Sequence, residues 1–107
     1  MTMKLDWLRG CATALVTPFA SDGSVDVDCL KKLTERQIEN GVKLLVPCGT
    51  TGESATMTPE EDWLVISTVV EVAKGRAKVI GGASNNDTAL TIRNTQKVRE
   101  LGADAAL

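Results

Sequence analysis

Four short, mostly apolar runs recur along the chain, each followed by a polar turn or by the end of the sequence. They cover residues 11–16, 42–47, 78–82 and 103–107. A strand inside a parallel sheet is covered on both faces, so it has a continuous apolar run and not a strict alternation. The runs therefore predict four buried strands, with the sequence ending inside the fourth.

Between these runs, apolar residues recur at spacings of three and four, as on one face of an α-helix. Capping residues and glycines place the expected helices between residues 26 and 41, 58 and 75, and 85 and 102. The second start is the clearest, because Thr58, Pro59 and Glu61 combine a cap, a proline at the first helical position and a capping box. The expected buried faces are Val27, Leu30, Leu33, Gln37 and Ile38; Trp63, Ile66, Val69, Val70 and Ala73; and Ala89, Ile92, Val98 and Leu101.

The predicted order is strand-helix three times and then a strand, which is typical of a parallel sheet with crossover helices. Because such crossovers are right-handed, successive units wound in one direction place every helix on the same side of the sheet. A complete TIM (β/α)8 barrel takes about 250 residues. The expected fold is therefore α/β, with residues 1–107 as the N-terminal part of a single TIM-barrel domain. The alternative is a small doubly wound, flavodoxin-like sheet, which would not stop inside a strand.

Composition narrows the classes of function. The 107 residues are 43% hydrophobic and 24% charged, with a net charge of -2, so no basic stripe points to nucleic acid or to an anionic membrane. There is no apolar segment of about 20 residues and no signal-peptide core, which favours a cytoplasmic protein. Three cysteines without a C-x-x-C pair indicate reduced thiols. The absence of histidine excludes a Ser-His-Asp triad, a Cys-His pair and any histidine-ligated metal within this chain.

The segment Gly49–Ser54 (GTTGES) follows the second expected strand, at the end of the sheet where α/β folds bind ligands. Its glycines allow a close approach of the backbone, and its threonine hydroxyls and N–H groups can hold a small anion. It is neither a phosphate-binding P-loop nor a G-x-G-x-x-G motif. The alternative is an ordinary Ser/Thr/Gly turn, which composition alone favours.

Three motifs together resemble the dihydrodipicolinate synthase family. They are ALVTPF at 14–19, GTTGES at 49–54, and VIGG at 79–82 with Asn86 shortly after it. This family belongs to the pyruvate-dependent aldolase superfamily, which also contains N-acetylneuraminate lyase. The resemblance runs from about Leu8 to the last residue with the expected spacing. Thr50 directly before Thr51 favours the synthases over the neuraminate lyases.

The resemblance implies a TIM barrel in which a lysine forms a Schiff base with pyruvate and the enamine then adds to an aldehyde. In the synthases the aldehyde is aspartate semialdehyde, and the product feeds lysine and diaminopimelate synthesis. Carried over by motif, Thr51 holds the pyruvate carboxylate with Gly49 and Gly52, and Thr50 belongs to a hydroxyl proton relay with two tyrosines. No metal is implied, and no cofactor beyond the covalent Schiff base. Members are homo-oligomers, either tetramers or dimers.

The Schiff-base lysine, both relay tyrosines and an arginine at the pocket mouth would all lie beyond residue 107. The lysines at 4, 31, 32, 43, 74, 78 and 97 are expected to be solvated surface charges. The chain alone is therefore expected to be inactive. Because the residues that select the aldehyde also lie largely beyond it, a 2-keto-3-deoxy sugar acid aldolase or a neuraminate lyase remains an alternative. A non-catalytic, truncated half-barrel module is the alternative from a different class.

Some synthases bind lysine as a feedback inhibitor, and the resemblance carries part of that frame. Ser54, Ala55 and Asn86 match it. Positions that hold histidines or a glutamate in sensitive members are Pro59, Asp62 and Leu90 here. Without the glutamate, a bound ammonium would be desolvated and unpaired, so the resemblance implies weak sensitivity or none.

Four other residues have structural explanations. Trp63 is expected in the core between helix and sheet, and Trp7 at the barrel bottom or at a subunit contact. Cys48 is expected to be a small buried hydrophobe, since no cation lies near it in sequence to stabilise a thiolate. The Glu53 carboxylate is expected to accept hydrogen bonds from backbone N–H groups, because a carboxylate beside an anion site would repel the substrate.

Overall fold

The computed structural model describes residues 4–107, which form a four-stranded parallel sheet and three α-helices. The strands lie side by side in chain order, each parallel to the next. The strands are β1 (Ala12–Ala14), β2 (Leu44–Val46), β3 (Lys78–Gly81) and β4 (Ala105–Ala106), and the α-helices between them are α1 (Val27–Glu39), α2 (Pro59–Ala73) and α3 (Thr88–Glu100). The predicted alternation is confirmed. A short 3-10 helix before α2, η1 (Ser54–Thr56), was not predicted.

Each strand is shorter than its apolar run. The pairing of β1 with β2 ends at Ala14 and Val46, and one further bond, from the Leu15 N–H to the Val46 carbonyl at 3.0 Å, continues it. Pro47 is fully buried although it lies beyond the strand. The apolar runs therefore mark buried residues, and the buried segment extends beyond the residues that form hydrogen bonds between strands.

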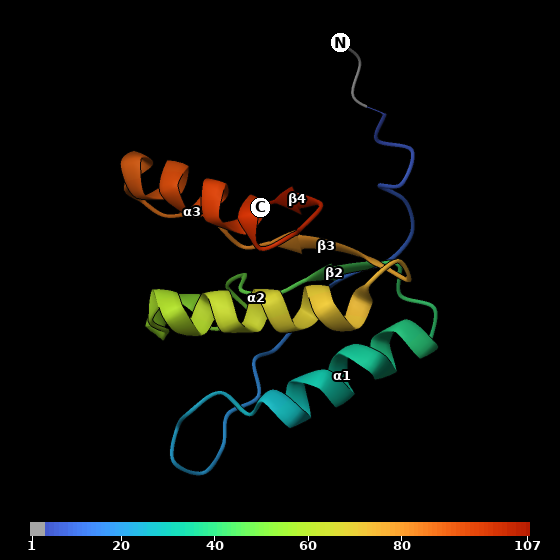
Figure 1. The fold of residues 1–107 in the computed structure, drawn as a ribbon, viewed down its shortest axis with the longest axis horizontal. Coiled ribbons are helices and arrows are strands. Elements are labelled where there is room, and N and C mark those ends of the chain that lie inside the picture. Colours follow the sequence, from blue (N-terminus) through green and yellow to red (C-terminus); the bar gives the residue numbers. More distant parts are fainter. Residues whose placement is uncertain (1–3) are drawn as a thin grey trace.

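The helices cover one face of the sheet (Figure 1). A Cβ added at Gly81 in β3 would lie 2.7 Å from Val98 Cγ1 in α3 and 3.5 Å from Ile66 Cδ1 in α2, so both helices pack against the same face. Leu30 of α1 and Leu45 of β2 belong to the same buried cluster as these contacts. This is the arrangement expected from right-handed crossovers wound in one direction.

The opposite face of the sheet is open at β1. Side chains alternate between the two faces along a strand. Following this alternation, Leu15 is 4% exposed on the helix side, whereas Val16 is 54% exposed. No helix of residues 4–107 covers Val16, as expected for the inner face of a barrel that further strands would close.

The predicted helix starts are confirmed by their hydrogen bonds. Asp26 caps α1 by accepting from the Cys29 N–H at 2.9 Å, and Asp87 caps α3. At α2 the Thr58 hydroxyl accepts from the Glu61 N–H at 3.2 Å while the Glu61 carboxylate accepts from the Thr58 N–H at 2.9 Å. This reciprocal pair is the predicted capping box.

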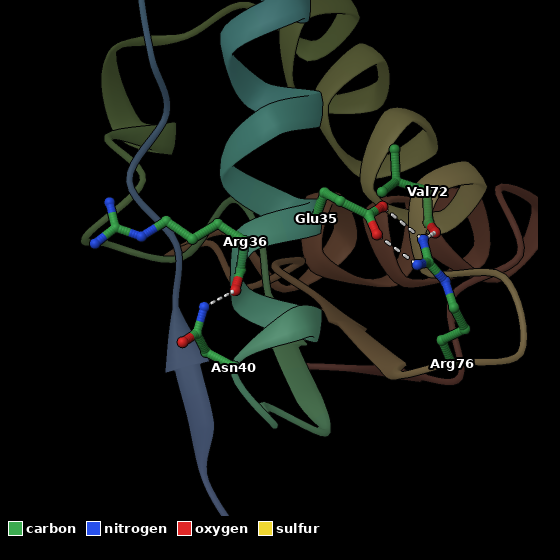
Figure 2. A network of polar contacts seen from close by, with 5 residues as sticks. All are labelled: Glu35, Arg36, Asn40, Val72 and Arg76. Atoms are coloured by element: carbon green, nitrogen blue, oxygen red, sulfur yellow. Dashed lines mark hydrogen bonds and ion pairs between the residues drawn. The ribbon is translucent and has the colours of Figure 1, made fainter.

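An ion pair ties α1 to the turn between α2 and β3 (Figure 2). The Arg76 guanidinium donates to both Glu35 oxygens at 2.6 and 2.7 Å, and to the Val72 carbonyl at 2.7 Å. These hydrogen bonds hold the pKa of Glu35 below its ordinary value. Because both side chains are exposed, the pair mainly fixes the direction of the turn and adds little stability.

The predicted buried face of α3 is only partly correct. Val98 is 3% exposed, as predicted, whereas Ile92 is 55% exposed and Ala89 is exposed as well, because α3 lies at the sheet edge and no described element covers that side. On α2, Val65 and Thr68 are buried although neither was predicted. A helix flanked by two others buries a wider stripe than a helix with one neighbour, and α2 is the helix in that position.

Candidate functional site

A groove of about 600 Å3 lies at the carboxyl ends of β2 and β3. Its walls come from the loop after β2, the first turns of α2, the segment after β3 and the start of α3. The residues that line it include Thr50, Ser54, Asp62, Trp63, Asn86 and Leu90. Ligands bind at this end of parallel sheets in both barrels and open folds.

The threonine loop, Gly49–Glu53, forms a tight turn beside this groove. The Gly52 N–H donates to the Gly49 carbonyl at 3.1 Å, and the Glu53 N–H donates to the Thr50 carbonyl at 3.0 Å. Thr50 and Thr51 lie at the exposed tip, and within residues 4–107 neither their N–H groups nor their hydroxyls have a hydrogen-bond partner. The loop thus presents several free, neutral donors, as an anion site requires.

The two candidate threonines differ in position. Thr50 and Gly49 line the groove, whereas Thr51 is exposed outside it. Gly52 is buried, and a Cβ there would lie 3.1 Å from the Leu15 carbonyl oxygen. The close backbone approach at Gly52 is therefore made to the protein's own β1 segment, and its role beside a ligand stays a prediction.

The start of the loop is fixed by backbone contacts. Cys48 has φ 58°, in the left-handed region that residues with a side chain rarely adopt. Gly82, just after β3, is pressed against it, because a Cβ at Gly82 would lie 1.9 Å from the Cys48 carbonyl oxygen. The Gly82 N–H also donates to the Pro47 carbonyl at 2.9 Å. Only glycine fits at position 82, a role that sequence reasoning did not assign.

Thr17, which follows β1, is a second site residue that sequence reasoning missed. It is 5% exposed, and its hydroxyl donates to the Gly52 carbonyl at 2.7 Å across 35 residues of chain. The position of Thr17 in the ALVTPF motif was noted, but no spacing rule links it to a loop that distant. The hydrogen bond attaches the end of the threonine loop to β1.

Asp62 of α2 forms the polar centre of the groove. The Ser54 hydroxyl donates to Asp62 Oδ2 at 3.0 Å, whereas Asp62 Oδ1 is buried without a partner among the described residues. Burial raises the pKa of Asp62, and the bond from Ser54 partly opposes this rise. Asp62 thus lines the groove and carries one buried carboxylate oxygen without a described hydrogen-bond partner.

Cys48 is the small buried residue that the sequence predicted. It is 4% exposed, and its thiol donates to the Asp62 backbone carbonyl at 3.5 Å. Burial raises the pKa of the thiol far above its usual value, and the nearby Asp62 carboxylate adds to the rise. A buried thiol with a raised pKa stays protonated at neutral pH, which favours the packing role over that of a nucleophile.

Ser54, Ala55 and Asn86, the residues matched to an effector frame, do line one groove. Leu90 of α3 and Asp62 of α2 lie in its walls as well. The structure thus brings the matched and the departing positions together. Their role as an effector site stays a prediction.

The expectations for Trp63, Lys97 and Glu53 change, and the one for Trp7 does not. Trp63 is half-buried between α2 and α3, with Lys97 Nζ 4.9 Å from its ring centroid, and so it is not in the core and Lys97 is not freely solvated. Glu53 is exposed, and no described backbone N–H donates to its carboxylate. Trp7 lines a cavity of about 490 Å3 with Lys43 and Lys78, at the amino ends of the strands. That position agrees with the predicted barrel bottom.

Two negative findings apply to the part of the chain that is described. In residues 4–107, no group of three or more Cys, Asp or Glu side chains is arranged to hold a metal ion. No helix in this range is both long and apolar enough to cross a membrane.

Comparison with known proteins connects this geometry to a family. Residues 7–107 match the model of the dihydrodipicolinate synthetase family. The 4-hydroxy-tetrahydrodipicolinate synthase of Maridesulfovibrio salexigens is 54% identical over 99 residues, which are 92% of this chain and 34% of that protein. That of Koribacter versatilis is 50% identical over 101 residues, or 94% and 34% of the two chains. The chain thus spans about a third of the length of these relatives.

Comparison with solved structures indicates the same family. The dihydrodipicolinate synthase from Aquifex aeolicus superposes with a TM-score of 0.87 at 44% identity, over 91% of this chain and 33% of that one. The chloride-inhibited synthase from Acinetobacter baumannii, complexed with pyruvate, gives 0.89 at 43% identity, over 91% and 33%. The four strands and three helices are therefore the N-terminal third of the TIM-barrel architecture of these enzymes, and the chain belongs to the dihydrodipicolinate synthetase family.

Proposed function

We propose that the chain is the N-terminal third of a 4-hydroxy-tetrahydrodipicolinate synthase, a Schiff-base lyase that condenses pyruvate with aspartate semialdehyde. The observation that carries this proposal is the threonine loop, whose free hydroxyls and N–H groups lie at the carboxyl end of β2. Relatives about 50% identical over this region are synthases of this kind. In the proposed enzyme, residues 1–107 belong to one TIM-barrel domain of a cytoplasmic homo-oligomer.

Thr51 is proposed to hold the pyruvate carboxylate. Its hydroxyl and the N–H groups of Thr50 and Thr51 are neutral donors, and charge-assisted hydrogen bonds of this kind are strong. Neutral donors suit a Schiff-base lyase, because a cation at this site would compete for the negative charge that develops on the enamine. The residue that forms the Schiff base would lie outside these 107 residues.

Thr50 is proposed to pass a proton along a hydroxyl relay. A hydroxyl both donates and accepts, so it can transfer a proton between two other hydroxyls without becoming charged. The partners would be tyrosines supplied by the rest of the barrel, since this chain contains none. Ser54, Ala55 and Asn86 are proposed to keep the backbone frame of an effector groove.

Trapping with borohydride tests the assignment. A complete protein that begins with this chain should form a stable adduct when sodium borohydride reduces its Schiff base with pyruvate, and the 107-residue chain alone should form none. Mass spectrometry detects the adduct. An adduct on the short chain, or none on the complete protein, would contradict the proposal, and the second result would favour a non-catalytic module.

Two threonine variants test the site within that complete protein. Thr51→Val removes a hydrogen bond to a charged group, worth roughly 1.5–3 kcal/mol, so the KM for pyruvate should rise roughly 10- to 150-fold. Thr50→Val keeps the shape but interrupts the relay, so kcat should fall by about 100-fold. Steady-state kinetics that match the unsubstituted protein in both variants would show that the site is assigned wrongly.

A further inference from the structure

We propose that Thr17 is a positioning residue that locks the threonine loop in the conformation presenting Thr50 and Thr51. This inference rests on the function proposed above, because it concerns how the proposed pyruvate site keeps its shape. The observation behind it is the 2.7 Å hydrogen bond from the buried Thr17 hydroxyl to the Gly52 carbonyl.

This hydrogen bond controls the orientation of one peptide unit. The Gly52 carbonyl and the Glu53 N–H belong to the same planar group, so they rotate together. The carbonyl accepts from Thr17, and on the opposite side the N–H donates to the Thr50 carbonyl at 3.0 Å. A hydrogen bond at each end of the plane fixes its rotation. If the Thr17 bond is lost, the bond to Thr50 is the one described hydrogen bond of this peptide unit that still opposes a flip.

The backbone conformation of Glu53 is unfavourable, and a flip of this peptide unit would relieve it. Glu53 has φ 61°, in the left-handed region that is disfavoured for a residue with a side chain. A flip of the Gly52–Glu53 peptide would let Glu53 leave that region, and Gly52 tolerates the accompanying change in its own backbone angles. The Thr17 hydroxyl therefore holds the loop against a local preference of its own sequence.

The surroundings confine the effect to the loop. Gly52 is packed so closely that a Cβ would lie 3.1 Å from the Leu15 carbonyl oxygen and 3.3 Å from Thr17 Oγ1. The start of the loop is held separately by Gly82 against Cys48. With its start fixed, the loop can respond to loss of the Thr17 bond only at Thr50, Thr51 and the Gly52–Glu53 peptide.

The kinetic consequence distinguishes Thr17 from a residue that is merely buried. In the complete protein, Thr17→Val should raise the KM for pyruvate and also lower kcat, each by about tenfold, because both threonines shift together. Thr51→Val should act mainly on KM, and Thr50→Val mainly on kcat. Thr17→Ser keeps the hydroxyl and should restore both constants to within about threefold of the unsubstituted protein.

Thr68→Val is the matched control. Thr68 is also 5% exposed, and its hydroxyl also donates to a backbone carbonyl at 2.7 Å, that of Leu64 within α2. Its substitution removes the same atoms and a bond of the same length without touching the loop. Both variants should lower the melting temperature, but only Thr17→Val should change the kinetic constants. Equal kinetics in the two variants, or no rescue by serine, would overturn the proposal.

Amide hydrogen exchange tests the lock without reference to activity. In the unsubstituted chain the Glu53 amide proton should exchange at least about tenfold more slowly than those of Thr50 and Thr51, which have no partner. Thr17→Val should remove that protection. Rapid exchange at Glu53 in the unsubstituted chain would overturn the proposal even if no Thr17 variant folds. A further outcome is that Thr51→Val leaves pyruvate binding unchanged while the Glu53 amide is protected as expected. In that case the proposed function is wrong, but the proposal that Thr17 holds the loop is supported.

Discussion

Adding a single methyl group at Gly82 tests the contact that fixes the start of the threonine loop. In Gly82→Ala the new Cβ would lie 1.9 Å from the Cys48 carbonyl oxygen and 2.4 Å from the carbonyl carbon, where about 3.5 Å is comfortable. Both opposing atoms belong to the backbone, so no side-chain rotation can relieve the clash. The segment after β3 must therefore move away from β2.

The loss of folding free energy in Gly82→Ala can be estimated from the contacts that this movement breaks. Overpacking of a well-packed site costs roughly 1–3 kcal/mol, and loss of the 2.9 Å bond from the Gly82 N–H to the Pro47 carbonyl adds about 1 kcal/mol. Replacing glycine by alanine also restricts the unfolded chain, which returns about 0.4–1 kcal/mol. The expected net loss is about 1–3.5 kcal/mol. For a chain of this size, that corresponds to a fall in melting temperature of at least about 4 °C.

Gly49→Ala is the matched control, because it makes the same chemical change close by, in the threonine loop against which the segment after β3 packs. A Cβ at Gly49 meets no atom within 4 Å, and its φ lies outside the left-handed region. This variant should be neutral or slightly more stable. Urea unfolding at one protein concentration, followed by circular dichroism, compares the two. If Gly82→Ala is as stable as Gly49→Ala, the close contact between the segment after β3 and Cys48 does not exist in solution.

Three further predictions concern the open sheet face and the groove. The 107-residue chain should associate, because Val16 is exposed on the open face at β1 and the edge strands β1 and β4 each lack a second neighbour among the described strands; a sharp monomer peak in light scattering would contradict this. Asp62→Asn should stabilise the fold at neutral pH by up to about 1 kcal/mol, since a carboxyl with a raised pKa destabilises the folded state once it ionises. The gain should disappear in urea titrations below the pKa of an unfolded aspartate, and a loss at neutral pH would refute it. With Leu90 in the groove wall, the complete protein, if it has the proposed activity, should resist inhibition by lysine. Half-inhibition below about 1 mM would mean that Asp62 supplies the missing carboxylate.

Local signals were sufficient for most of the fold. The cap at Thr58 and the capping box with Glu61 are made within four residues, so the sequence shows them directly. The edge of the sheet was harder to predict. Ile92 has the spacing of a buried residue, but the exposure of a helix face depends on which neighbour is present, and none of the described elements lies beside it.

In the candidate site, too, local features could be predicted from the sequence and contacts between distant segments could not. Thr50 and Thr51 could be selected as candidates because their residue types and their place after a strand are local features, and both lie at an exposed loop tip. The residues that hold the loop in place, Thr17 and Gly82, could not be identified from the sequence. Thr17 is 35 residues from Gly52, and Gly82 is 34 positions after Cys48, so only the parallel pairing of β1, β2 and β3 brings them together.

The glycines of the threonine loop show why the pattern alone misleads. A rule that assigns left-handed backbone to glycine selects Gly49 and Gly52, yet the left-handed residues are their neighbours Cys48 and Glu53. Each such residue costs roughly 1–2 kcal/mol, so the loop's own sequence disfavours its conformation by about 2–4 kcal/mol. Contacts from outside the loop must offset this cost: Gly82 acts at Cys48, and Thr17 acts at the peptide that precedes Glu53. The free donors of the loop are therefore positioned by β1 and β3, and an isolated peptide of the same sequence should not keep their arrangement.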